Sequence, residues 1–227
     1  MFPPSAVFRL GRYEVAVRYR PAPPGERLGG DWYDARIGAD GSAVVVIGDV
    51  AGHGLGAAAA MMRIGSALRG LSVTGLPANS LLGYLNQLIC SDECPERIVS
   101  AIVCRLGQDQ PALRWAQAGH PPPVLVSAGA ARLLDRPSGL LLGTTPAAEY
   151  DLGHHDLAAG DVLLLYTDGL VERRGQDIRA GFGALLSAAG GGLGETAAEA
   201  TEAVLSRLGL PPTDDDVCLI ALKVGGG

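Results

Sequence analysis

Lysine is almost absent from this chain of 227 residues: Lys223 is the only one among 18 basic side chains. The shortage excludes a phosphate-binding GxxxxGK[ST] loop, and it argues against a Schiff-base lysine because Lys223 lies in a terminal apolar strand pattern. No GxSxG string occurs, which removes the nucleophile elbow of serine hydrolases. Positive charge is also not in excess, since the formal net charge is -6. Nucleic acid is therefore not expected as the main partner.

Long apolar runs and paired cysteines are lacking as well. The longest uncharged stretch, residues 70–91, contains Pro77 and several polar side chains, so we expect no transmembrane helix and no membrane partner. No basic region followed by an apolar run marks the N-terminus, so no secretory signal is expected. None of the four cysteines forms a CxxC pair: Cys90, Cys94, Cys104 and Cys218. These features predict a cytoplasmic protein with free thiols.

Enough apolar material is present for a real core. Hydrophobic residues make up 48% of the chain and charged residues 19%, a balance that excludes disorder for most of its length. We find no internal repeat and no linker long enough to separate domains. The sequence therefore predicts a single domain over residues 1–227, with its core at about 13–224.

The pattern of apolar residues predicts the secondary structure. Strands are expected at 13–20, 32–37, 43–48, 98–106, 113–118, 123–126, 162–167 and 217–224. Helices are expected at 55–71, 77–90, 180–189 and 195–208. Helix pairs interrupt runs of strands and do not alternate with single strands. This order favours an α+β fold, with mostly antiparallel sheets covered by helix pairs.

Acidic residues stand at three strand ends. Asp49 directly follows the strand at 43–48, Asp168 follows the strand at 162–167, and residues 214–216 are three aspartates that precede the last strand. If that last strand runs antiparallel to the other two, all of these acids gather at one edge of the sheet. Taken singly they have ordinary explanations, because Asp-Gly pairs are common in turns and an aspartate run is often a solvated loop. Their coincidence favours a shared site.

A predicted hairpin adds a fourth acid. Asp40-Gly41 supplies the backbone conformation of a tight turn. A hairpin centred on Asp40 pairs residues whose numbers sum to 80, which places Asp31 opposite Asp49 and turns Asp34 to the other face. Converging carboxylates without basic neighbours repel one another unless a cation lies among them. Carboxylate and carbonyl oxygens suit Mg²⁺ or Mn²⁺, and no His/Cys set has zinc spacing.

The chain resembles the SpoIIE/RsbU branch of the PPM (PP2C-like) metal-dependent serine/threonine phosphatases. The matching strings follow the family's order and span residues 13–224: Gly29-Gly30-Asp31-Trp32-Tyr33-Asp34, Ile47-Gly48-Asp49-Val50-Ala51-Gly52-His53-Gly54, Ala118-Gly119-His120-Pro121, Leu165-Tyr166-Thr167-Asp168-Gly169-Leu170-Val171-Glu172 and Asp215-Asp216-Val217. The resemblance implies an α-β-β-α sandwich with two Mn²⁺ or Mg²⁺ ions at one edge.

Roles for five residues follow from the resemblance. Asp49 matches the bridging metal ligand, with the Val50 carbonyl beside it, and Asp168 and Asp215 match further metal ligands. Asp31 matches the acid that acts on the second metal or its waters. The four aspartates are accordingly the catalytic set. Asp215 is chosen over its neighbours because the family has an acid followed by Asp or Asn at this point.

Three departures from related phosphatases are visible. Cys218 stands where the family usually has Thr or Ser. Ala51 occupies the place of the general-acid histidine in eukaryotic relatives, so His53 is not assigned that role. His53, which opens a helix after a glycine, and His120, which precedes three prolines, are more often turn or packing residues. No obvious counterpart exists for the arginine that those relatives use on the substrate phosphate.

The implied reaction is hydrolysis of a phosphoserine or phosphothreonine monoester by a metal-held water, without a covalent intermediate. A phospho-aspartate route is disfavoured because Asp49 is followed by Val50 and Ala51, with no second aspartate two residues on. The alternative is a non-catalytic regulator of the same fold that binds a phosphoprotein. The intact acid set argues against it.

Partners also follow from the resemblance. They are a phosphorylated STAS-type anti-anti-sigma protein as substrate, an N-terminal sensory domain or regulatory partner, and a second copy of the chain in a homodimer. The chain begins too close to the first matching string to hold a sensor, so we expect an excised domain or a stand-alone form. The helices at 55–71 and 77–90 have the position of the family's regulatory switch, although they could equally serve only as core cover.

Overall fold

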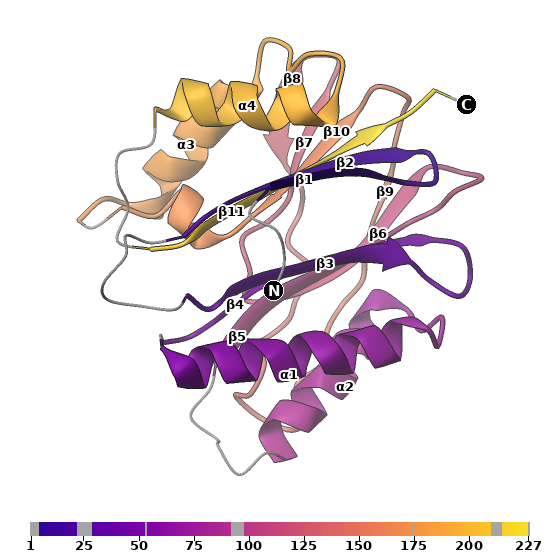
Figure 1. Ribbon diagram of the computed structural model, residues 1–227, viewed down its shortest axis with the longest axis vertical. Coiled ribbons are helices and arrows are strands. Elements are labelled where there is room, and N and C mark those ends of the chain that lie inside the picture. Colours follow the sequence, from indigo (N-terminus) through magenta and orange to yellow (C-terminus); the bar gives the residue numbers. More distant parts are fainter. Residues whose placement is uncertain are drawn as a thin grey trace. The chain divides into compact units, whose positions relative to one another are not determined.

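The computed structural model describes residues 5–21, 29–52, 54–91, 98–173, 175–209 and 215–226 (Figure 1). They belong to two compact units. The first unit comprises Met1–Glu26, Pro121–Leu134 and Leu157–Gly227, and the second comprises Arg27–His120 and Asp135–Asp156. Each unit has its own antiparallel sheet and its own helix pair.

The first unit contains a six-stranded sheet. Its strand order is β1 (Ser5–Leu10), β2 (Tyr13–Arg20), β11 (Val217–Val224), β10 (Val162–Tyr166), β7 (Val124–Ser127) and β8 (Ala130–Leu133). The helices α3 (Ile178–Ala189) and α4 (Ala197–Leu208) share an apolar core with this sheet. A capping box starts α4, in which Thr196 and Glu199 each accept a hydrogen bond from the other's backbone N–H. A 3-10 turn, η1 (Asp168–Leu170), follows β10.

The second unit contains a five-stranded sheet. Its strand order is β3 (Asp31–Ile37), β4 (Ala43–Val50), β5 (Val99–Leu106), β6 (Ala112–Ala118) and β9 (Gly153–Asp156). The helices α1 (Leu55–Ser72) and α2 (Ala78–Ser91) pack on one face of it, over a core that includes Trp32, Val46 and Leu82. Alternate residues of β4 point to the two faces, and nearly all of them are buried. This double burial explains why β4 reads as a continuous apolar run.

All eight predicted strands and all four predicted helices are present, with shifts of a few residues at their ends. For example, α3 begins at Ile178, two residues early, because Asp177 caps it by accepting a hydrogen bond from the Arg179 backbone N–H at 2.9 Å. Three strands were missed: β1, β8 and β9. All three lie at sheet edges. These three strands bury almost no side chains, so they lack a strong apolar pattern.

The α+β class with antiparallel sheets and helix pairs is thus confirmed. One expectation was wrong: Asp49 does not share a sheet with Asp168 and Asp215. Its strand, β4, pairs with β3 and β5, whereas β10 and β11 pair with each other. A central strand has only two neighbours, and these pairings use both sides of β4. The expectation was wrong because it placed all of these strands in one sheet.

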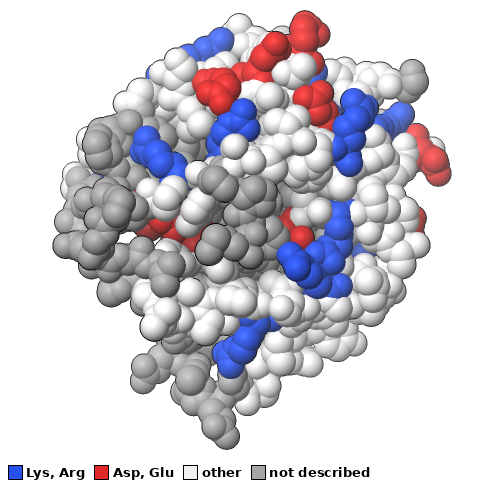
Figure 2. Space-filling model, viewed as in Figure 1, with Lys and Arg blue, Asp and Glu red and all other residues white. Residues whose placement is uncertain are grey.

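Other expectations concern the cysteines and the surface. Cys90, Cys104 and Cys218 are free thiols, whereas Cys94, His53 and Asp214 lie outside the described residues. No helix in the described ranges is long and apolar enough to span a membrane. On the face shown in Figure 2, the described basic and acidic side chains lie in small groups on a largely uncharged surface.

Candidate active site

The β3–β4 hairpin pairs the first two candidate acids. Its register runs from Ile37 opposite Ala43 to Asp31 opposite Asp49, as the turn at Asp40 predicted. At the turn, Asp40 Oδ1 accepts hydrogen bonds from the Ser42 backbone N–H at 3.2 Å and from Ser42 Oγ at 2.8 Å. This local turn chemistry fixes the pairing of the two acids. Asp31 is buried and Asp49 is half-buried.

Asp34 lies on the opposite face of β3, as predicted. It forms an ion pair with Arg36, and its Oδ2 lies 3.8 Å from Arg69 Nε on α1. Its charge is therefore matched by two arginines on the helix-covered face. Asp34 belongs to the packing of α1 on the sheet and not to the candidate acids.

At Gly30 the backbone passes close to Asp49 and to the Val50 carbonyl. The Val50 backbone N–H donates to the Gly30 carbonyl at 3.1 Å. A Cβ atom at position 30 would overlap the Val50 carbonyl oxygen and lie 2.6 Å from Asp49 Oδ1. Only glycine allows this approach, so Gly30 has a steric reason within the Gly29-Gly30-Asp31 string. Gly30 was noted in the sequence, but its contact with Val50 was not predictable from it.

Asp31, Asp49 and Ser100 form a row of cross-strand partners on three neighbouring strands. Ser100 on β5 is the cross-strand partner of Asp49, just as Asp49 is the partner of Asp31. Its Oγ lies 2.9 Å from Nδ1 of His120, a fully buried residue. The carbonyl of His120 accepts a hydrogen bond from Gln117 Nε2 at 2.9 Å. Ser100 was not predicted as a site residue.

In the first unit, the other two candidate acids lie just after β10 and just before β11. The Thr167 backbone N–H donates to the Cys218 carbonyl at 3.1 Å, and the Cys218 N–H donates to Thr167 Oγ1 at 2.9 Å. A Cβ atom at Gly169 would overlap the Asp216 carbonyl oxygen and lie 3.6 Å from the Asp215 Cβ. The turn that begins at Asp168 is thus held against the start of β11.

The charges at this turn repel one another. Burial raises the pKa of Asp168, and the nearby carboxylates of Asp215 and Glu172 raise it further. Asp216, in contrast, is buried and accepts a hydrogen bond from the Tyr19 hydroxyl at 2.8 Å. Asp215 is exposed. The two neighbouring acids thus differ in exposure, and Asp216 is the one bound by Tyr19.

Arg173 stabilises the same turn through hydrogen bonds to its backbone carbonyls. Its Nη1 donates to the Gly169 carbonyl at 3.0 Å and its Nη2 to the Leu170 carbonyl at 3.2 Å. The Asp168 carbonyl accepts from the Val171 backbone N–H at 2.8 Å. Arg173 was not predicted from the sequence. Within either unit, no three described His, Cys, Asp or Glu side chains are grouped so that they could hold an ion by themselves.

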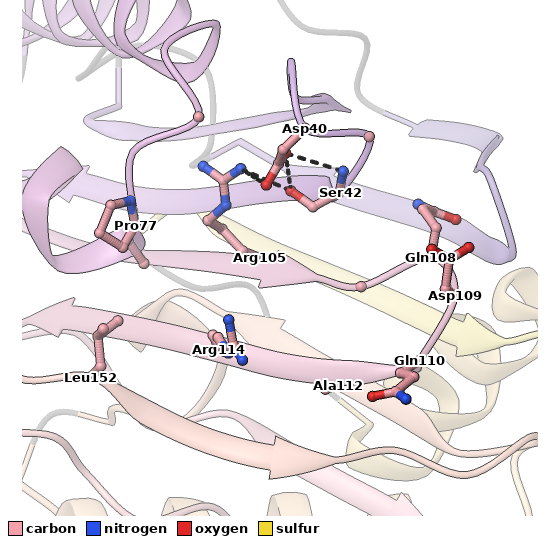
Figure 3. A pocket seen from close by; sticks show the side chains of 14 residues that line it. Asp40, Ser42, Pro77, Arg105, Gln108, Asp109, Gln110, Ala112, Arg114 and Leu152 are labelled. Carbon is pink, nitrogen blue, oxygen red and sulfur yellow. Dashed lines mark hydrogen bonds and ion pairs between the residues drawn. The ribbon is translucent and has the colours of Figure 1, made fainter.

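The pocket in Figure 3 lies at the other end of the five-stranded sheet, beside the Asp40 turn. It has a volume of about 890 Å³. Arg105 Nη2 lies 2.6 Å from Asp40 Oδ2 and 3.0 Å from Ser42 Oγ, and Arg105 also donates to the Leu76 carbonyl. Burial acts in the opposite direction, yet the Ser42 hydrogen bonds and the Arg105 charge lower the pKa of Asp40. The buried guanidinium of Arg105 is thus paired with Asp40, and we do not assign the reaction to this pocket.

Comparison with known proteins gives consistent results. Residues 39–225 match the family described as Stage II sporulation protein E (SpoIIE). Phosphoserine phosphatase RsbU of Bacillus subtilis is 28% identical over 152 residues, which cover 66% of this chain and 45% of that protein. This chain therefore spans less than half of that relative.

Solved structures show the same fold. The RsbU and RsbW domains of Rv1364c from Mycobacterium tuberculosis match with a TM-score of 0.83 and 28% identity, over 94% of this chain and 62% of that one. The catalytic domain of the serine/threonine protein phosphatase PstP, in complex with two manganese ions, matches with a TM-score of 0.69 and 15% identity. That match covers 94% of this chain and 99% of PstP. The fold is thus of the PPM/PP2C type, and the chain belongs to the SpoIIE family.

Proposed function

We propose that this chain is a metal-dependent protein serine/threonine phosphatase that hydrolyses a phosphoserine or phosphothreonine monoester. The observation that carries the proposal is the turn at Asp168, which Gly169 holds against the start of β11. Burial, and then the nearby carboxylates of Asp215 and Glu172, raise the pKa of this half-buried acid. A bound cation would relieve this repulsion. The relative named phosphoserine phosphatase supports the same reaction class.

The proposed ligands of two Mn²⁺ or Mg²⁺ ions are Asp49, the Val50 carbonyl, Asp168 and Asp215, with Asp31 acting on the second ion. The donor set fits, because it consists of carboxylate and carbonyl oxygens only. The two manganese ions of the PstP structure support this assignment. The proposal requires the two units to act as one PPM-type domain over residues 1–227, which would bring the two acid pairs together.

When bound, such ions would lower the pKa of a water molecule and neutralise phosphoryl oxygens. The residues of the chain orient the donors. The β3–β4 register holds Asp31 beside Asp49, and Gly30 allows the close approach to the Val50 carbonyl. Arg173 holds the Asp168 turn through the Gly169 and Leu170 carbonyls. Donors fixed in this way need little rearrangement when they bind charge.

The proposed substrate is a phosphorylated STAS-type anti-anti-sigma protein. The match to a SpoIIE-family profile and to RsbU supports a protein substrate of this kind. An N-terminal sensory domain or a regulatory partner, and a homodimer, belong to the same proposal.

Metal-dependent phosphate release tests the proposed reaction. We expect the purified chain to release phosphate from a phosphorylated STAS protein with Mn²⁺, and to stop when EDTA is added. The control is the Asp156→Asn variant, which should release phosphate like the wild type. Asp156 is an exposed acid at the last position of β9, in the same unit as Asp49, and it is not a proposed ligand. Binding of the phosphoprotein with no release at any metal concentration would instead favour the non-catalytic regulator.

The helix pair α1–α2 is proposed as the regulatory element. α1 begins at Leu55, shortly after Val50, and it contacts both β3 and β4. A shift of α1 would therefore displace Asp49 and the Val50 carbonyl. Several large apolar side chains of the pair are exposed, among them Leu55 and Met62. A partner that covers them would bias the position of α1.

If this regulation operates, the isolated chain populates the assembled metal site only in part, so it binds the second ion weakly and turns over slowly. Titration of activity with Mn²⁺ measures this. We expect saturation only well above micromolar metal. Saturation at micromolar metal with high turnover would mean that the site is already assembled and that α1 and α2 serve only as core cover.

A further inference from the structure

The pair formed by Ser100 and His120 has no role in the proposed reaction so far. Asp31, Asp49 and Ser100 are successive cross-strand partners on β3, β4 and β5. Directly paired side chains point to the same face of a sheet, with Cβ atoms about 4.5–5.5 Å apart. The row lies on the face away from the helices, because the neighbouring residues Trp32, Val50 and Val99 belong to the core beneath α1 and α2.

The residues around His120 determine its position. Gly119 has a φ of +66°, and a Cβ there would collide with the Leu141 side chain. This left-handed residue ends β6 and forms a bridge with Ala101 on β5. His120 is thereby brought to Ser100, and buried Gln117 fixes its carbonyl. The Ala118-Gly119-His120 string thus has a geometric purpose in the second unit.

The hydrogen-bond donors and acceptors of Ser100 and His120 indicate a role for the pair. A serine hydroxyl carries one hydrogen and accepts up to two hydrogen bonds, and a neutral imidazole donates from one nitrogen only. If His120 donates from Nδ1 to Ser100 Oγ, the serine hydrogen is directed elsewhere. The acceptor beside Ser100 in the register is Asp49. A carboxylate that binds a metal is commonly oriented by such an outer donor.

We propose that Ser100, held by His120, is a positioning residue that donates to the Asp49 carboxylate and orients it for metal binding. This inference rests on the proposed function, since it assumes that Asp49 is a ligand. His120 acts one step further out, by fixing the orientation of the Ser100 hydroxyl. Neither residue is expected to contact the substrate.

Calorimetric Mn²⁺ affinity of the full chain tests the proposal without relying on turnover. Loss of an outer-shell partner typically costs about 10- to 100-fold in metal affinity. We expect Ser100→Ala to weaken Mn²⁺ binding by roughly 10-fold or more, and Ser100→Thr, which keeps the hydroxyl, to restore it. Ser127→Ala is the matched control, because Ser127 is a half-buried strand serine in the other sheet. It should bind Mn²⁺ like the wild type.

His120 is tested by a matched pair of variants. His120→Asn keeps an amide donor near the position of Nδ1 and should retain most of the affinity, whereas His120→Leu should weaken it as much as Ser100→Ala does. Wild-type affinity in Ser100→Ala, while Asp49→Asn loses binding, would overturn the role of Ser100 alone. Wild-type affinity in Asp49→Asn would instead overturn the proposed metal site. Circular dichroism identifies any variant that has failed to fold. If His120→Leu fails to fold, the Ser100→Ala variant still tests the proposal.

Discussion

Changing Asp168 to asparagine is expected to abolish phosphate release while the chain stays folded. A carboxamide provides an oxygen but not the negative charge that a divalent cation requires. Loss of an outer-shell partner reduces metal affinity or activity by up to roughly 100-fold, and loss of a direct ligand should reduce activity by more than that. Asp49→Asn should behave in the same way, and Asp156→Asn should keep wild-type activity. Activity within a few-fold of wild type in either ligand variant would refute the site.

The same substitution should not destabilise the metal-free protein. Burial and the charges of Asp215 and Glu172 raise the pKa of Asp168 in the folded state. The folded protein thus binds this proton more tightly than the unfolded chain, and its stability falls as the pH rises above the ordinary aspartate pKa of about 3.9. Asparagine removes this effect. We expect the Asp168→Asn chain to be at least as stable as wild type near neutral pH.

The pH dependence checks the sign of this argument. Urea unfolding of metal-free wild type and Asp168→Asn should give similar free energies below the ordinary pKa, where the carboxyl is protonated in both states. The advantage of the variant should appear as the pH rises and be complete above the raised folded-state pKa. A variant that is less stable than wild type at neutral pH would show that the Asp168 charge is stabilised in the metal-free fold.

Changing Gly30 to alanine should have the next largest effect. The new methyl group would overlap the Val50 carbonyl oxygen and approach Asp49 Oδ1 at 2.6 Å. Both neighbours are parts of the proposed site, and the carbonyl is backbone that cannot rotate away. We expect a loss of about 1–3 kcal/mol in unfolding free energy, as for other overpacked sites. Activity should fall at least about 10-fold, because a small misplacement near the reacting groups is costly.

Gly83→Ala is the control for the glycine prediction. Gly83 lies within α2, and a Cβ there would meet no atom within 4 Å. The change should raise stability by up to about 1 kcal/mol through helix propensity. Equal stability and activity in Gly30→Ala and wild type would show that the chain can move away from Val50 without cost, and the close approach would then have no role in the site.

The sequence was informative wherever the structure depends on nearby residues. The Asp40 turn fixed the β3–β4 register, and with it the pairing of Asp31 and Asp49. Strongly apolar strands and amphipathic helices were found for the same reason. The Asp34 prediction also held, because strand alternation is a local property.

What the sequence could not supply are pairings between distant segments. The β4–β5 register determines that Ser100 lies beside Asp49, but α1 and α2 separate the two strands in the chain. No turn fixes their alignment, so Ser100 remained an ordinary polar residue in a strand. The division of the strands between two sheets was missed for the same reason. The strand ends had indicated a shared site on one sheet. Because the acids lie in two sheets, the proposal of a shared site depends on the resemblance to known phosphatases.

The central place of β11 has a consequence for the order of folding. β11 lies between β2 and β10, so it pairs with a strand from the start of the chain and positions the segment that carries Asp215. Pairing across so much sequence carries a high loop-closure cost and is slow compared with hairpin formation. During synthesis, the β3–β4 hairpin with Asp31 and Asp49 can form early. The sheet of the first unit cannot be completed until residues 217–224 have left the ribosome, so the segment that carries Asp215 cannot be held in place before that point.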